Sequence, residues 1–208
     1  MSDHHWNEMY KTGFLPWDTG EPDGHLVELI GSGAISSGGS ILEVGCGTGT
    51  NSLWLAGRGF SVLGVDIARA AVDQANQKKN GMSLSCDFAV MDFLHDGSLS
   101  RSFDMVFDRG CFHVFDKKRE RDLFARQVSR VLKSSGTWLS LIGSTEGGPR
   151  DSGPPRRTAM DVIQAIEPYL EIVELRSVFF QSNLPFSAKA WLCMARHRKD
   201  LVQPSTRR

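Results

Sequence analysis

A glycine-rich segment offers the clearest chemistry in this sequence. Three glycines alternate with two other residues over five positions: Gly45, Cys46, Gly47, Thr48 and Gly49. They directly follow a short apolar run, 41–44. An apolar run that ends in glycines predicts a buried strand and then a loop whose backbone can turn sharply and approach a ligand closely. At the start of a helix, such a loop binds nucleotide-containing cofactors.

Two details of this loop distinguish between the cofactors that it could bind. A dinucleotide fingerprint, G-x-G-x-x-G, would need glycine or alanine at position 50, where the sequence has Thr50. Glu43 precedes the first glycine by two residues, and a carboxylate so close to a pyrophosphate would repel it. The same carboxylate suits the sulfonium and ammonium groups of S-adenosylmethionine. The loop therefore favours that cofactor over NAD or FAD.

Two aspartates follow the next two predicted strands. Asp66 comes 21 residues after Gly45, where a carboxylate can accept hydrogen bonds from both hydroxyls of a ribose, with Ile67 beside it. Asp92 follows the third strand and could accept from an adenine amino group while Phe93 packs on the ring. Because aspartate is common in the turns after strands, a purely structural role is the alternative for both.

The hydrophobic pattern predicts the elements that position these residues. Strands are expected at 41–44, 61–65, 84–90, 103–107, 137–142, 172–180 and 188–195, and a charged helix at 116–133. Thr158 and Asp161 form a capping-box pair at the start of a later helix. The last two strands are joined by a segment too short for a parallel crossover, so they should pair antiparallel.

These elements predict a single α/β domain over 1–208 with a Rossmann-like, seven-stranded, mostly parallel sheet, helices on both faces and a C-terminal antiparallel hairpin. Within it we expect an N-terminal lid and first helix at 1–40, the core at 41–197, and a disordered tail at 198–208.

Residues 41–197 resemble the class I S-adenosylmethionine-dependent methyltransferases. The first motif matches at 43–49, the second at Val65-Asp66-Ile67, the third at Met91-Asp92-Phe93 and the fourth at 103–113. The resemblance implies S-adenosylmethionine as cofactor. The residues it assigns to cofactor binding are Glu43, Gly45, Cys46, Gly47, Thr48, Asp66, Ile67, Asp92 and Phe93.

The N-terminal segment 6–18 is similar to the leading segment of the thiopurine S-methyltransferase superfamily, which includes thiol, halide and tellurite methyltransferases. This resemblance implies that Trp6 and Trp17 help to enclose the methionine moiety of the cofactor, since aromatic faces attract a sulfonium. The alternative is that both tryptophans anchor the segment to the core.

The pair Asp108-Arg109 also matches that superfamily, so Arg109 is expected to contact the carboxylate of the cofactor. A salt bridge from Arg109 to Asp108 or Asp66 is the alternative.

Methyl transfer from a sulfonium is an in-line displacement, for which the protein supplies positioning and electrostatics. A thiolate needs little base catalysis, whereas an oxygen nucleophile usually needs a general base. His113 is the candidate base, with Arg109 beside it at the reaction centre; a packing role is the alternative for His113. The candidate acceptor-binding residues are Trp17, His113, Arg156 and Arg157. The two arginines, like Arg150, lie in a Gly- and Pro-rich loop, 143–157, and the alternative is that all three are only solvated there.

Composition limits the partners. With 24 basic and 24 acidic residues the formal net charge is zero, which disfavours nucleic acid as a partner. We expect no signal peptide, no membrane span, no metal site, and reduced cysteines in a cytoplasmic protein. Monomer and homodimer remain open. The predicted function is methyl transfer to a small molecule, with a thiol or another soft nucleophile as the preferred acceptor. The alternatives are a small-molecule O- or N-methyltransferase, a non-catalytic adenosylmethionine-binding protein and, less favoured, an NAD-dependent oxidoreductase.

Overall fold

The computed structural model describes residues 3–13, 15–96, 99–100, 102–148 and 153–199. Its helices are α1 (Asp3–Thr12), α2 (Gly24–Gly31), α3 (Thr50–Ala56), α4 (Arg69–Lys79), α5 (Lys118–Val131) and α6 (Ala159–Ile166), with a short 3₁₀ turn, η1 (Phe112–Val114). Its strands are β1 (Ser40–Val44), β2 (Ser61–Asp66), β3 (Cys86–Val90), β4 (Phe103–Arg109), β5 (Leu132–Gly143), β6 (Glu171–Phe179) and β7 (Lys189–Arg196). The tail predicted to be disordered lies, from residue 200 on, outside the described residues, as does Arg150.

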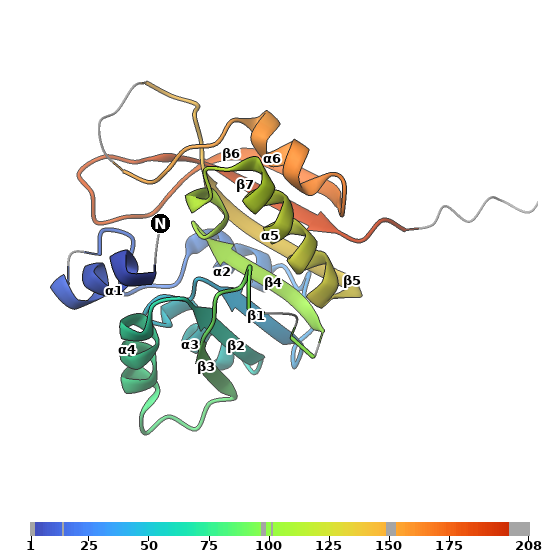
Figure 1. Cartoon of the computed structure of the whole chain (residues 1–208). Helices are drawn as coiled ribbons and strands as arrows, with labels where there is room; N and C mark the ends of the chain where they lie inside the picture. The colour runs from blue at the N-terminus through green and yellow to red at the C-terminus, as the bar shows by residue number, and fades with distance from the viewer. Residues whose placement is uncertain (1–2, 14, 97–98, 101, 149–152, 200–208) are drawn as a thin grey trace, which may run out of the picture.

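The strands form one seven-stranded sheet in the order β3-β2-β1-β4-β5-β7-β6 (Figure 1). The pairs among β1 to β5 are parallel, and β7 runs antiparallel to both β5 and β6. The predicted mostly parallel sheet with a terminal antiparallel hairpin is therefore confirmed. Because β7 runs antiparallel to both β5 and β6, strand β6 runs in the same direction as β5. The connection from β6 to β7 therefore lies at the same end of the sheet as the carboxyl ends of the parallel strands.

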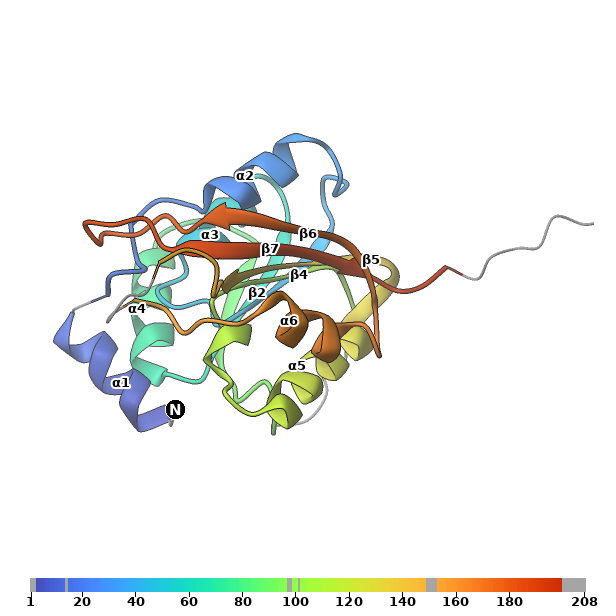
Figure 2. The same cartoon turned by 90° about the horizontal axis from the view of Figure 1, so that it is seen from above.

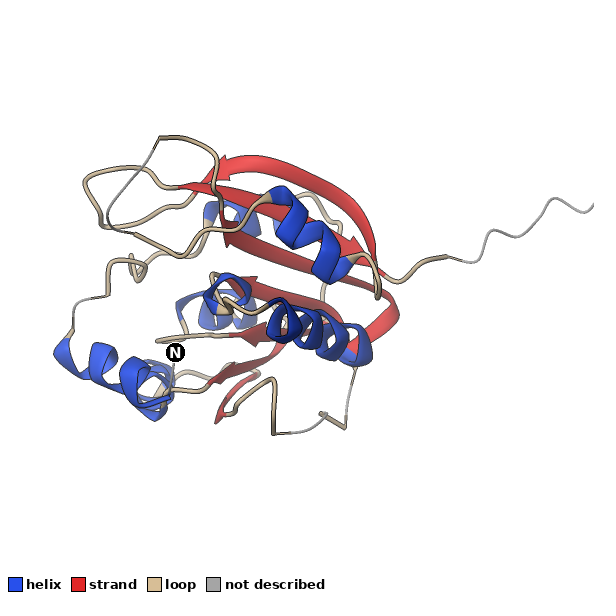
Figure 3. Cartoon of the chain, turned by 45° about the horizontal axis from the view of Figure 1, so that its top comes forward, coloured by secondary structure: helices blue, strands red, loops and turns tan. Residues whose placement is uncertain are grey.

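Helices cover both faces of the sheet, as predicted (Figures 2 and 3). Helices α5 and α6 pack on one face through residues such as Phe124, Val128 and Ile166. Helices α2 and α3 cover the other face through Leu26 and Leu55. Helix α4 packs on β2 and β3 and also against α1. Both faces of the central strands are buried, which is why these strands read as continuous apolar runs.

The boundaries differ from the predicted ones where two elements meet without a break. Strand β5 begins at Leu132, immediately after α5, whereas the sequence predicted a helix to 133 and a strand only from 137. Residues 133–136 are polar and lie where the register between β4 and β5 shifts, between the pairs Phe103–Leu132 and Met105–Thr137, and no local pattern reveals this irregularity. The capping box at Thr158 is confirmed, since its side chain accepts from Asp161 N while Asp161 accepts from Thr158 N.

The glycine loop, the N-terminal segment and the β6–β7 connection all lie at the carboxyl end of the parallel strands (Figure 1). This is where open α/β sheets bind their ligands. Over the described part of the chain, none of the helices has the length and apolarity that crossing a bilayer requires.

Candidate active site

The glycine loop connects β1 to α3 and is held against the neighbouring strand. The backbone N–H groups of Gly45 and Cys46 both donate to the carbonyl of Val65, at 2.8 and 3.0 Å. Gly45 and Gly47 have φ angles of 72° and 55°, which residues other than glycine rarely adopt. A Cβ on Gly47 would lie 2.8 Å from the hydroxyl of Tyr10. The loop is thus a close-fitting cradle with space only for glycine at these two positions.

Asp66 ends β2 directly beside this loop. Its Oδ2 accepts from Gly47 N at 2.9 Å, and its Oδ1 accepts from Ala68 N at 2.9 Å. Burial raises the pKa of this carboxyl, while the backbone N–H donors oppose the rise. Each carboxylate oxygen can accept a second hydrogen bond, so the geometry is compatible with the predicted contact to ribose hydroxyls. The half-buried Ile67 follows it.

Glu43 turns out to be tied to α3. Its Oε1 accepts from the side-chain amide of Asn51 at 2.9 Å, and its Oε2 accepts from the hydroxyl of Ser52 at 2.5 Å. Burial raises the pKa of Glu43 to about 7. Both oxygens are engaged and the residue is 1% exposed, so it anchors the first turn of α3 under the loop.

The N-terminal segment folds onto the loop through an aromatic cluster. Trp17 lies between Trp6 and Tyr10, with ring centroids 5.8 and 6.2 Å away in edge-to-face geometry. Helix α1 is held to α4 because Asn7 Oδ1 accepts from Ala70 N. The structure therefore brings both predicted tryptophans together, on the side of the loop where Tyr10 approaches Gly47.

A second contact joins the segment to the loop through Thr48. Its hydroxyl donates to Asp18 Oδ2 at 2.5 Å and accepts from Lys78 Nζ at 2.5 Å. Lys78 belongs to α4, so three parts of the chain meet at this hydroxyl. Thr48 thus also serves to close the N-terminal segment over the loop.

Arg109, at the end of β4, pairs with neither Asp108 nor Asp66. Its Nε donates to Asp23 Oδ2 at 2.7 Å, its Nη1 donates to the carbonyl of Trp17 at 3.1 Å, and its Nη2 donates to the carbonyl of Gln181. Asp108 points into the core, where burial raises its pKa to about 6. The guanidinium therefore connects β4 to the N-terminal segment and to the β6–β7 connection.

Asp92 and Phe93 follow β3 and have local partners. Asp92 Oδ1 accepts from Leu94 N at 3.0 Å and Oδ2 lies 2.9 Å from His95 Nδ1, which is the geometry of a turn aspartate. The Phe93 ring is 8% exposed and packs edge-on against Phe124 at 5.1 Å. Their contacts to adenine stay predictions.

His113 is a buried residue of η1. Its Nδ1 accepts a hydrogen bond from Gly143 N at 2.7 Å, and its ring meets Phe180 edge-on at 5.8 Å. Accepting at Nδ1 fixes the neutral tautomer that carries its proton on Nε2. In this tautomer Nε2 carries a proton, and Nδ1 already accepts a hydrogen bond.

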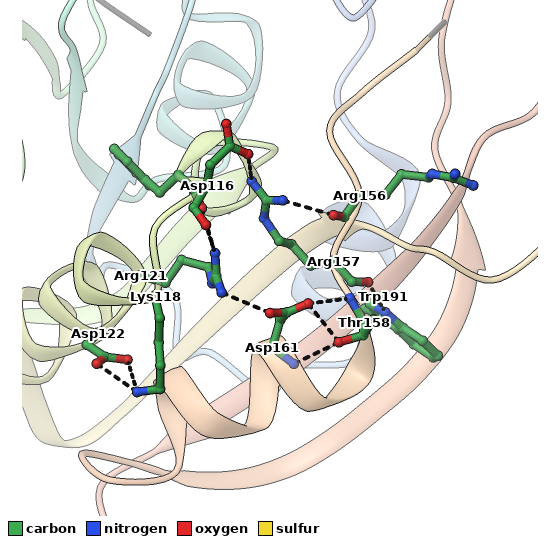
Figure 4. Close-up of polar contacts among 10 residues, drawn as sticks. Asp116, Lys118, Arg121, Asp122, Arg156, Arg157, Thr158, Asp161 and Trp191 are labelled. Atoms are coloured by element: carbon green, nitrogen blue, oxygen red, sulfur yellow. Dashed lines mark hydrogen bonds and ion pairs between the residues drawn. The ribbon is translucent and has the colours of Figure 1, made fainter. Parts of the chain in front are cut away.

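The predicted acceptor-binding arginines have different environments (Figure 4). Arg157 has contacts within the protein: its guanidinium donates to Asp116 at 2.7 Å, and its carbonyl accepts from Trp191 Nε1 at 3.0 Å. Arg121 completes the cluster by donating to the carbonyl of Asp116 and to Asp161. Arg156 is half-buried and donates only a long hydrogen bond, 3.4 Å, to Gly148 O among the contacts described.

A groove of about 510 Å³ lies between residues 19–22 and 179–187. Its walls include Phe179, Phe180 and Phe186, and Glu21 is the one charged residue among the described residues that line it. The ring of Phe180 lies with its centroid 5.4 Å from Arg109 Cζ, and Gln181, which also lines the groove, accepts from Arg109. The groove is therefore next to the Arg109 contacts.

Sequence reasoning missed Tyr10, Asp18, Asp23 and Gln181. Asp23 carried one usable signal, since it precedes the apolar pattern of α2 and caps that helix by accepting from His25 N. Its pairing with Arg109, 86 positions away, had no signal in a single sequence.

The fold and loop together define a Rossmann-like protein that binds a nucleotide-type cofactor. The family model described as a methyltransferase domain matches residues 41–136. An uncharacterized methyltransferase of Schizosaccharomyces pombe is 34% identical over 107 residues, which are 51% of this chain and 73% of the relative. The chain belongs to the S-adenosylmethionine-dependent methyltransferases of class I, as the sequence predicted, and it is an enzyme of that family with S-adenosylmethionine as its cofactor.

Other relatives are more distant in sequence. A probable thiol methyltransferase of Arabidopsis thaliana is 26% identical over 77% of this chain and 70% of its own, and a thiocyanate methyltransferase of Brassica oleracea is 25% identical over 88% and 77%. The structure solved in a study of the conversion of a disulfide bond into a thioacetal group during echinomycin biosynthesis has a TM-score of 0.81 at 24% identity, covering 94% of this chain and 92% of that one. Magnesium protoporphyrin IX methyltransferase from Synechocystis, solved with bound cofactor, has a TM-score of 0.70 at 17% identity, covering 93% and 96%. Both structures share the fold.

Proposed function

We propose that this enzyme transfers the methyl group of S-adenosylmethionine to a small-molecule thiol or another soft nucleophile, in the cytoplasm. The observation that carries the acceptor class is the 2.7 Å hydrogen bond from Gly143 N to His113 Nδ1. Because the ring then carries its proton on Nε2, the candidate base is arranged to donate and not to take a proton. A thiol with a pKa near about 8.5 ionises partly by itself and needs no such base.

The described residues fit the cofactor. We assign ribose binding to Asp66, whose two oxygens can each accept a further hydrogen bond. We expect the backbone to approach the cofactor most closely at Gly45 and Gly47, where no Cβ fits. Trp6 and Trp17 would supply aromatic faces at the methionine end. When bound, the cofactor supplies an electrophilic methyl on a sulfonium. The protein's contribution is to orient the two reactants and to exclude water.

The groove beside Arg109 supports a small organic acceptor. Its phenylalanines offer apolar contact, and Glu21 gives it no attraction for phosphate. The zero net charge of the chain also argues against nucleic acid as the substrate. All four cysteines are described and are free thiols, in keeping with a reducing compartment.

The names of some relatives support this acceptor class, and the names of others suggest different acceptors. Two relatives are named for thiol and thiocyanate methylation. A third, from Mycobacteroides abscessus, is named as a 2-heptyl-1-hydroxyquinolin-4(1H)-one methyltransferase and is 23% identical over 81% of this chain. That name keeps a small-molecule oxygen acceptor as the second candidate.

The test combines binding and turnover. Calorimetry with S-adenosylmethionine, and with NAD as the control ligand, measures cofactor binding without an acceptor. Purified protein with methyl-labelled S-adenosylmethionine is then offered alkyl and aryl thiols, thiocyanate, selenite, tellurite, phenols and amines. We expect methylated thiols and matching adenosylhomocysteine. Methylation of phenols or amines alone would contradict the acceptor class, and tight binding without any turnover would favour a non-catalytic binding protein.

A further inference from the structure

We propose that Asp23 is the positioning residue of this active site: it fixes Arg109 so that the N-terminal segment and the β6–β7 connection are held closed over the cofactor. The inference rests on the proposed function only in its kinetic readout. Its structural basis is a set of contacts that centre on one buried carboxylate.

Asp23 has a partner on every polar atom of its side chain. Oδ2 accepts from Arg109 Nε at 2.7 Å, and Oδ1 accepts from His25 N at 2.9 Å, which caps α2. Its backbone N–H donates to Asn51 Oδ1 at 2.9 Å. Asp23 is 2% exposed, so this residue joins β4, α2 and α3 away from water.

Through Asn51 the contacts reach the cofactor loop. The amide of Asn51 donates to Glu43, which is two residues before Gly45. One continuous polar chain therefore runs from Arg109 through Asp23 and Asn51 to Glu43, and it links the strand exit of β4 to the base of the glycine loop. A displacement of Asp23 would therefore disturb both Arg109 and the contacts of Glu43 at the base of the glycine loop.

Arg109 uses its remaining donors on the two segments that close the site. Nη1 donates to the carbonyl of Trp17, and Nη2 donates to the carbonyl of Gln181. Further bonds join the same two segments: Asn183 N donates to Pro16 O at 2.9 Å, and Gly24 N donates to Gln181 Oε1 at 3.0 Å. In Figure 1 the β6–β7 connection reaches toward α1 at this end of the molecule.

The charge of Asp23 is what keeps Arg109 in place. The side chains of Arg109 and Asp23 are 12% and 1% exposed, so each charge depends on the other for compensation. Removing one charge from such a buried pair leaves the other uncompensated. Without the carboxylate, Arg109 would turn toward solvent and release the carbonyls of Trp17 and Gln181, which weakens the closure and leaves it to the remaining bonds between the two segments.

Asp23→Asn separates this role from helix capping, because asparagine caps a helix about as well as aspartate. We expect the variant to fold and to bind S-adenosylhomocysteine about tenfold or more weakly by calorimetry. We also expect faster limited proteolysis of the segment before α2, and a KM for S-adenosylmethionine that rises by a similar factor while kcat falls less. Glu171→Gln is the matched control, since it neutralises an acid in an exposed arginine pair with Arg196.

A double-mutant cycle with Arg109→Gln tests whether the two residues act together. If they do, the double variant binds S-adenosylhomocysteine no more weakly than the single variant with the lower affinity. Wild-type affinity and protease resistance in Asp23→Asn would overturn the proposal, and so would a lowered melting temperature with affinity and KM unchanged. The calorimetry and proteolysis need no acceptor, so they decide the role of Asp23 even if no thiol is methylated.

Discussion

The backbone N–H of Gly143, at the end of β5, donates to His113 Nδ1 at 2.7 Å. Replacing His113 with asparagine keeps an acceptor at the Nδ1 position, whereas alanine leaves a buried N–H without its partner. We predict that His113→Asn methylates a thiol within about tenfold of the wild-type rate and with the same pH profile, and that His113→Ala loses about 2–4 kcal/mol of stability. Thermal unfolding and pH–rate profiles check this. A profile that loses one ionisation in the asparagine variant would restore His113 as the general base.

Asp66 and Asp92 are both strand-end aspartates, but their surroundings predict different effects on cofactor affinity. We expect Asp66→Ala to weaken S-adenosylmethionine binding by at least about a hundredfold, because hydrogen bonds to a charged group contribute about 1.5–3 kcal/mol each. Asp92 is engaged by its own turn, so Asp92→Asn should change affinity by less than about tenfold. Calorimetry measures both. Unchanged affinity in the Asp66 variant would refute the ribose assignment.

Glu43 should make the stability of the protein depend on pH. Burial raises its pKa from 4.5 to about 7 in the folded state. The folded state therefore binds more protons than the unfolded state between these values, so the contribution of Glu43 is fully present below about pH 4.5 and is lost as the pH rises to about 7.

Glu43→Gln mimics the protonated acid and removes this dependence. We predict that the variant matches the wild type near pH 5 and is more stable at pH 8, by about 3 kcal/mol as the upper limit set by the shift. Urea unfolding at both pH values measures the difference between the two proteins. Comparing the two also cancels the similar contribution of Asp108, whose pKa is raised to about 6. A difference that does not change with pH would contradict the prediction.

The sequence predicted well whatever depends on neighbouring residues. The glycine spacing, the strand that ends at Asp66 and the capping box at Thr158 are local patterns, and the structure has all three. The partner of Arg109 was not predictable, because Asp23 lies 86 positions away and nothing in the sequence distinguishes it from the other acidic residues as a partner for Arg109. The early start of β5 was not predictable for the same reason, since it depends on the pairing of Leu132 with Phe103 of β4, 29 positions away.

Arg156 and Arg157 were predicted together as acceptor-binding residues, but the structure predicts opposite results for them. The Arg157 side chain is 11% exposed and its guanidinium holds Asp116, which joins the turn before α5 to the loop before α6 (Figure 4). Arg157→Met keeps the apolar stem but removes the charge, and because Asp116 is 86% exposed we expect a stability loss of about 0.5–1 kcal/mol. Arg156→Met should leave the melting temperature unchanged and raise the KM only for an anionic acceptor, because the Arg156 side chain has weak contacts within the protein. Thermal unfolding and the ratio of KM values for a carboxylated and an uncharged thiol separate the two roles. If Arg157→Met keeps its melting temperature and loses affinity for the carboxylated thiol, then Arg157 binds the acceptor and its pair with Asp116 is secondary.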